Sequence, residues 1–195
     1  MSTTRHTHAV DLDTALAFVN TVELERGEPF DHLRSTSEAL DWFHRHGLIH
    51  QAALHSAAGE ATLERIRRTR AALRELADAT FEGRSPQPGA VDEVNRAQRA
   101  QEVVQLVPSP DGLRLDHGHV GDPVDDALAN LATPIVNEVT SGRRDRLRAC
   151  ASETCRWIFY DDSRTGRRRW CDMASCGNRA KAARHRARVK EAQTG

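Results

Sequence analysis

CASETCRWIFYDDSRTGRRRWCDMASCGNRAKAARHRAR, residues 150–188, is the stretch around which the rest of the chain is organised. It holds all four cysteines of the 195-residue chain, Cys150, Cys155, Cys171 and Cys176, at the spacing C-x4-C-x15-C-x4-C. Two close pairs separated by an insert of hairpin length can surround one tetrahedral ion with four sulfur ligands. We therefore predict a structural Zn²⁺ site with these four ligands and no open position for catalysis; free thiols or a redox disulfide pair are the alternative.

Charge is distributed unevenly along the chain. Residues 1–142 contain 13 arginines, no lysine and 22 acidic residues, which gives 13 − 22 = −9, whereas residues 143–190 contain 15 basic and 5 acidic residues, or +10. Such asymmetry is typical of an acidic body joined to a basic module that binds nucleic acid, although a solvated basic face needs no partner. We expect two domains, residues 1–142 and residues 143–195.

The sequence contains no apolar run of the length that spans a bilayer, and the segment MSTTRHTHAVDLD has no apolar signal-peptide core. These features predict a cytoplasmic protein without a membrane segment. Because thiols stay reduced in that compartment, paired cysteines favour a metal over disulfides.

Hydrophobic periodicity predicts a mainly α fold for the N-terminal domain. A change to period two around Pro108-Ser-Pro-Asp-Gly112 predicts one small β-hairpin over residues 103–115. The expected helices are residues 14–27, 38–46, 59–84, 90–101 and 123–139. Asn20 and Thr21 are polar residues inside the first of these apolar patterns. We therefore expect them either to form hydrogen bonds with a neighbouring element or to line a pocket.

The C-terminal segment predicts a small treble-clef-like zinc finger, a β-hairpin followed by a helix. Residues 156–161 and 167–171 are expected to form the two strands, and a helix is expected from Ala174 to about Ala192. Basic side chains cover most of this helix and the second strand. The predicted nucleic-acid contacts are Arg167, Arg168, Arg169, Arg179, Lys181, Arg184, Arg186 and Arg188. Asn178 is expected to support the metal loop by bonding backbone amides or a cysteine sulfur, rather than to read a base.

The same residues carry a resemblance to known families. The segment CRWIFYDDSRTGRRRWCDMASCGNRAKAARHRAR resembles the CGNR zinc finger, named after the tetrapeptide at Cys176 to Arg179, and LAFVNTVELERGEPFDHL with DWFHRHGL is similar to the ABATE domain that precedes this finger in bacterial proteins. Where relatives often have tyrosine, this chain has His185. The resemblance implies a stress-induced transcription regulator whose finger binds DNA or RNA, and it implies no catalytic residues.

Three functions remain open from the sequence. A DNA-binding regulator is favoured, because arginine matches phosphate and guanine geometry. An RNA-binding protein would stack bases on Trp157, Phe159, Tyr160 or Trp170. In the third, the N-terminal domain binds a small-molecule effector or a protein, with a pocket formed by Asn20, Thr21, Asp31, Trp42 and His44, or it forms a homodimer. The sequence contains no nucleophile elbow, glycine-rich phosphate loop or metal triad, so it does not predict an enzyme.

Overall fold

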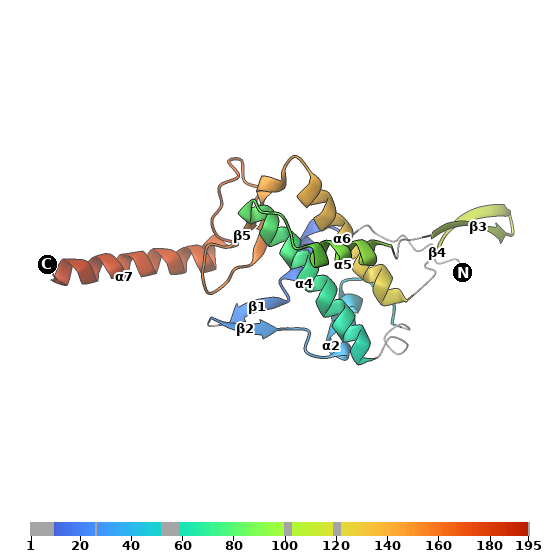
Figure 1. The fold of residues 1–195 in the computed structure, drawn as a ribbon, viewed down its shortest axis with the longest axis horizontal. Coiled ribbons are helices and arrows are strands. Elements are labelled where there is room, and N and C mark those ends of the chain that lie inside the picture. Colours follow the sequence, from blue (N-terminus) through green and yellow to red (C-terminus); the bar gives the residue numbers. More distant parts are fainter. Residues whose placement is uncertain (1–9, 26, 52–58, 100–102, 119–121, 195) are drawn as a thin grey trace.

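The fold of the N-terminal part is organised around the long helix α4 (Glu60–Glu82), which contacts α1 (Leu12–Val19), α2 (Thr36–Arg45), α5 (Pro88–Gln98) and α6 (Pro123–Thr140) (Figure 1). This computed structural model describes residues 10–25, 27–51, 59–99, 103–118 and 122–194. The mainly helical fold class is confirmed. Within these ranges, no helix combines the length and the apolar character needed to cross a membrane.

Each long helix buries the residues that its period predicts. In α4 the side chains of Leu63, Ile66 and Leu73 face the core, and Gly83 ends the helix in the left-handed conformation (φ 67°). Helix α2 begins with a capping box, in which Ser35 and Glu38 exchange side chain–backbone hydrogen bonds. The large side chains that are completely or almost completely buried include Phe18, Phe43, Ile66, Leu73, Leu128, Leu131 and Ile135.

The first helix is shorter than the prediction of residues 14–27. Helix α1 is capped by Asp11 and ends at Val19, and the chain then forms a hairpin of β1 (Val22–Glu25) and β2 (Glu28–Asp31). The segment Val22-Glu-Leu-Glu alternates apolar and charged residues, which fits a strand as well as a short piece of helix. Gly27, read as a helix stop, lies in the turn of this hairpin with φ 93°.

The predicted hairpin near Pro108 is confirmed as β3 (Val103–Ser109) and β4 (Gly112–Gly118), paired antiparallel. It extends from the end of the molecule opposite to the C-terminal helix (Figure 1). Helix α6 begins after the Asp122 cap and continues through Pro134 as one helix.

The C-terminal segment forms a hairpin and a helix, but its strands are not the predicted pair. Strand β6 (Ile158–Tyr160) pairs with β5 (Leu147–Ala149), and residues 167–171 form no strand. The reason lies in side-chain chemistry: the Arg168 N–H donates to the Asp161 carboxylate (2.7 Å) rather than to a neighbouring strand. A 3₁₀ turn (Arg144–Arg146) precedes β5, a short π-helix η2 (Met173–Gly177) follows the loop, and α7 (Asn178–Thr194) ends the described chain.

One hydrophobic core is shared between the two parts of the chain. Leu147, Ala149 and Ile158 of the C-terminal hairpin are buried in the same cluster as the helices α1, α4 and α6. Cys150, Phe159 and Cys176 form a second, smaller cluster around which Trp170 and the remaining cysteines pack. The division at residue 142 stays a prediction, and the core crosses it.

Candidate metal centre and basic surface

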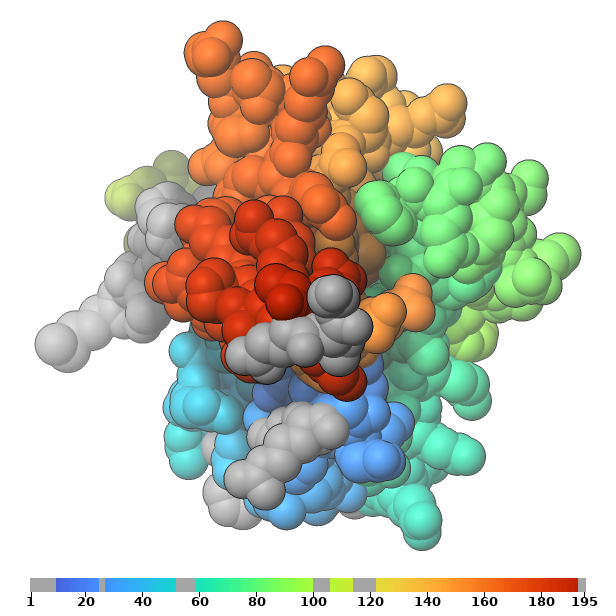
Figure 2. Space-filling view, turned by 90° about the vertical axis from the view of Figure 1, so that its left-hand side faces the viewer, coloured from blue at the N-terminus to red at the C-terminus, as the bar shows by residue number. Residues whose placement is uncertain are grey.

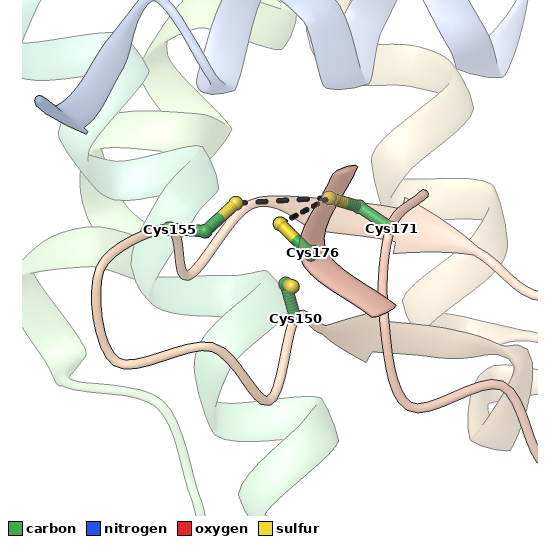
Figure 3. A group of neighbouring side chains, drawn as sticks. All are labelled: Cys150, Cys155, Cys171 and Cys176. Carbon is green, nitrogen blue, oxygen red and sulfur yellow. Dashed lines mark hydrogen bonds between the residues drawn. The ribbon is translucent and has the colours of Figure 1, made fainter. Parts of the chain in front are cut away.

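The four cysteines converge on one point (Figure 3). Cys150 follows β5, Cys155 and Cys171 lie in loops, and Cys176 lies in η2. All four sulfurs are within 4.8 Å of one another, with 3.6 Å between Cys155 and Cys171 and 3.8 Å between Cys171 and Cys176. A tetrahedral Zn²⁺ with bonds of about 2.3 Å holds its sulfurs about 3.8 Å apart. The arrangement fits a structural zinc site with four cysteine ligands and confirms the predicted cofactor.

The electrostatics of the cluster also fit a cation. Burial raises the pKa of the Cys155 thiol to about 11, and burial together with the neighbouring thiols raises the pKa of Cys171. Burial acts in the same direction on Cys176, but a hydrogen bond from Arg179, aided by the other cysteines, lowers its pKa on balance. Four sulfurs so close together repel one another as thiolates, and a Zn²⁺ ion removes that penalty.

The second pair of ligands is held by the residues around η2. Asp172 caps it by accepting hydrogen bonds from the backbone N–H groups of Ala174 (3.1 Å) and Ser175 (2.8 Å), a role that the sequence analysis missed. The Asn178 amide donates to the Ala174 carbonyl oxygen (3.0 Å). The sulfur contact expected of Asn178 is instead made by Arg179, whose Nη2 lies 3.0 Å from the Cys176 Sγ.

The first pair of ligands is docked on the N-terminal helices. Arg156, directly after Cys155, has the left-handed backbone conformation (φ 56°) that is uncommon for a residue with a side chain. The Arg74 Nη2 of α4 donates to its carbonyl oxygen over 2.7 Å. The Cys150 N–H donates to the next carbonyl oxygen, that of Trp157 (2.8 Å). The segment from Cys150 to Cys155, called the first knuckle from here on, is therefore held from both sides.

Asn20, at the end of α1, binds the outer edge of strand β6. Its side-chain Nδ2 donates to the Ile158 carbonyl oxygen (2.8 Å) and its Oδ1 accepts from the Ile158 N–H (2.9 Å). Only 4% of the Asn20 surface is exposed. Its side chain pairs with the edge of β6 as a neighbouring strand would, although the two residues are 138 positions apart in the sequence. Beside it, the Trp157 Nε1 donates to Glu23 (2.9 Å). Of the two roles open for Asn20, the structural one is present.

Part of the predicted pocket lies on a groove. Asn20, Thr21 and Trp42 line a groove of about 670 Å³ between α1, α2 and the β1–β2 hairpin. Trp157 of the finger lines the same groove. Asp31 lies elsewhere, in a bidentate ion pair with the buried Arg70 (2.8 and 2.7 Å). His44 is exposed and does not line the groove; its Nδ1 lies 3.2 Å from the Ile49 carbonyl oxygen.

The predicted nucleic-acid residues fall into two groups. Arg168 and Arg179 bind within the finger: Arg168 lies over the Phe159 ring (5.1 Å) and donates to the Cys171 carbonyl oxygen (2.7 Å). Arg179 is nevertheless exposed, as are the residues of the other group: Arg167, Arg169, Lys181, Arg184, Arg186 and Arg188.

Of the four aromatic rings near the cysteines, three are packed to a large extent. Phe159 is 8% exposed, Trp170 packs on the cysteine cluster, and Tyr160 packs on the main core. Trp157 is 38% exposed.

Asp161 orders the arginine-rich loop, and its replacement by Asn is expected to destabilise the protein by about 1–3 kcal/mol. It is fully buried and accepts hydrogen bonds from the N–H groups of Ser163 (3.0 Å) and Arg168 (2.7 Å), one on each oxygen. Burial alone would raise its pKa, but these bonds hold the pKa below the ordinary value, so the stabilisation is complete at neutral pH and is lost as the pH falls through the folded-state value.

Asparagine has a single oxygen, so Asp161→Asn leaves one of these N–H groups unpaired. The matched control is Asp162→Asn, at a side chain that is 81% exposed, which is expected to change stability by less than about 0.5 kcal/mol. Urea unfolding of the zinc-loaded variants at pH 7 measures both. Equal effects of the two substitutions would contradict the role of Asp161.

Comparison with protein families agrees with this geometry. Residues 146–189 match the CGNR zinc finger, and residues 12–142 match ABATE, whose description reads "Putative stress-induced transcription regulator". No curated protein matches the chain. The ABATE match covers well over half of the 195 residues, and the cysteine cluster lies inside the CGNR match. The chain therefore belongs to the ABATE family and carries a CGNR zinc finger at residues 146–189.

Proposed function

We propose that the protein is a cytoplasmic, non-enzymatic transcription regulator that binds duplex DNA through its zinc finger and helix α7. The observation that carries this proposal is α7 itself, which extends from the body as a single straight helix (Figure 1). Every residue from Lys181 to Ala192 is exposed, and seven of the helix residues are arginine, lysine or histidine. A helix that is exposed along its length and carries this many basic side chains gains little stability from packing on its own protein, so it suits an anionic partner.

The surface around the base of α7 supports the same partner. Figure 2 looks along the helix from its free end, with the finger loops behind its base. Arg164, Arg167 and Arg169 of these loops are exposed, whereas Arg146 and Arg168 support the loop from inside through bonds to backbone carbonyl oxygens. The exposed arginines and α7 together offer phosphate contacts in two places.

The burial and the contacts of the aromatic rings near the cysteines favour duplex DNA over single-stranded RNA as the partner. Recognition of unpaired bases relies on exposed rings on which bases stack. Phe159 has Arg168 over its face and is buried, and the Trp157 N–H is bonded to Glu23. The rings near the cysteines thus serve the finger and its docking.

A regulatory role for the N-terminal domain is supported by the groove between α1, α2 and the β1–β2 hairpin. Its volume of about 670 Å³ is within the range of small-molecule sites, and Trp157 of the finger forms one wall. An effector bound there would contact Trp157. Trp157 lies between Arg156 and Ile158, the two residues whose backbone groups are bound by Arg74 and Asn20. We propose this groove as the effector site in place of the predicted set that included Asp31 and His44.

Salt dependence of DNA binding tests the main proposal. Fluorescence anisotropy with the zinc-loaded chain and a duplex of about 30 base pairs is expected to give log K falling linearly with log salt, by about 0.9 per phosphate contact. Arg188→Gln is expected to lower this slope by about one, whereas Arg99→Gln, at an exposed arginine after α5, leaves it unchanged. Absence of binding at low salt would refute the proposal, and tighter binding of single-stranded RNA in competition would favour the RNA alternative.

A further inference from the structure

The basic residues of α7 form two lines along the helix. At about 100° per residue, Lys181, Arg184 and Arg188 share one side. Arg179, Arg186 and Lys190 share another, and the centres of the two lines lie about 170° apart around the helix axis. All six side chains are exposed. The positive charge is therefore concentrated on two opposite flanks.

The two strips between the flanks differ from each other. One strip contains Asn178, Ala182, His185 and Val189, and Val189 is 42% exposed although it is apolar. The other contains Ala180, Ala187 and the acidic Glu191. The first strip carries no acidic residue, whereas the second would bring a carboxylate close to an anionic partner.

We propose that α7 lies in the major groove of duplex DNA with the strip of Ala182 and Val189 toward the base edges. The line of Lys181, Arg184 and Arg188 then contacts the phosphates of one strand, and the line of Arg186 and Lys190 contacts those of the other. This inference rests on the proposed function and specifies its geometry.

The dimensions of the groove favour this arrangement. A helix with its side chains is about 10–12 Å wide, and the major groove of B-DNA is about 12 Å wide with a phosphate backbone along each wall. A helix lying on the outside of one backbone would use a single basic line. Two residues of the strip that faces the bases, Ala182 and Val189, are small or apolar, so they allow close approach and can contact thymine methyl groups, and the polar His185 lies beside them.

The base of α7 is held in a way that fixes this orientation. Among the described elements, α7 contacts mainly η2, and the residues of both basic lines are exposed. At the junction, the Arg179 Nη2 donates to the Cys176 sulfur, which ties the rotation of the helix to the metal centre.

Charge removal from one line at a time tests the proposal with the zinc-loaded full chain. Arg188→Gln and Arg186→Gln are each expected to lower the salt slope of DNA binding by about one, and the double variant by about two. The phosphates of one DNA strand at a time can be replaced by neutral methylphosphonates. With one strand neutralised, Arg188→Gln should no longer change the salt slope, and with the other strand neutralised, Arg186→Gln should no longer change it.

A matched pair of substitutions tests the side that faces the bases. Ala182→Gln is expected to weaken binding at least tenfold, because its bulk enters the groove, whereas Ala187→Gln on the opposite strip leaves the affinity unchanged. Both alanines are exposed and both variants keep good helix formers. If only one basic line changes the slope, or if the two alanine variants behave alike, the groove geometry is wrong while DNA binding itself stands. If the parent chain binds no DNA, both proposals fail.

Discussion

Removal of zinc is expected to unfold the finger and to lower the melting temperature of the whole chain. The cluster around the sulfurs is small, with Phe159 and Trp170 as its only large apolar residues in the described chain, so it cannot be stable without a metal. Structural zinc contributes about 10–16 kcal/mol in comparable small domains. Because Leu147 and Ile158 of the same hairpin belong to the main core, the loss extends to the helices.

Elemental analysis and thermal unfolding with and without a chelator measure this effect. One zinc per chain is expected, together with a large fall in melting temperature on chelation. Cys150→Ser, at a buried ligand, should reproduce the result without chelator, and Glu153→Gln, at an exposed residue of the same knuckle, should not. A zinc-free chain with an unchanged melting temperature would show that the cysteines do not act as a metal site.

Replacement of Asn20 by Ala is expected to destabilise the protein by roughly 2–6 kcal/mol. It leaves the buried N–H and carbonyl groups of Ile158 without partners, and each such group costs about 1–3 kcal/mol. Since the bond joins α1 to β6, the docking of the finger is weakened together with the fold.

Asn178→Ala is the control for this substitution, because Asn178 is exposed and makes one hydrogen bond, to the Ala174 carbonyl oxygen. Its expected effect is below about 1 kcal/mol. Chemical unfolding gives both values, and hydrogen exchange at the Ile158 amide reports the local opening. The pair of hydrogen bonds between Asn20 and Ile158 is called the Asn20 clamp here. An Asn20→Ala protein as stable as the parent chain, with a protected Ile158 amide, would rule out a stabilising role of this clamp.

Local signals in the sequence predicted the elements that depend on local chemistry. The cysteine spacing indicated the metal cluster, and Pro108 to Gly112 marked a hairpin. The family resemblance added the identity of the finger, which the matches over residues 12–142 and 146–189 confirm.

Long-range pairing accounts for what the sequence did not predict. The partner of strand β6 lies before the first cysteine, at Leu147 to Ala149, and no local pattern separates this choice from residues 167–171. The Asn20 clamp joins positions 138 residues apart. The Arg179 contact with Cys176 has a local signal, because residues three apart on a helix share a face, but the same arginine also belongs to the basic run that is typical of nucleic-acid binding.

The shared core has a consequence for protein engineering. A finger excised at residue 143 would carry Leu147 and Ile158 into water without the helices that cover them, and it would also lose the Asn20 and Arg74 partners of its first knuckle. Grafting residues 143–195 onto another protein should therefore give an aggregation-prone fusion. A transplantable unit has to include α1 and α4 as well, so this finger behaves as the end of a larger building block and not as an exchangeable cassette.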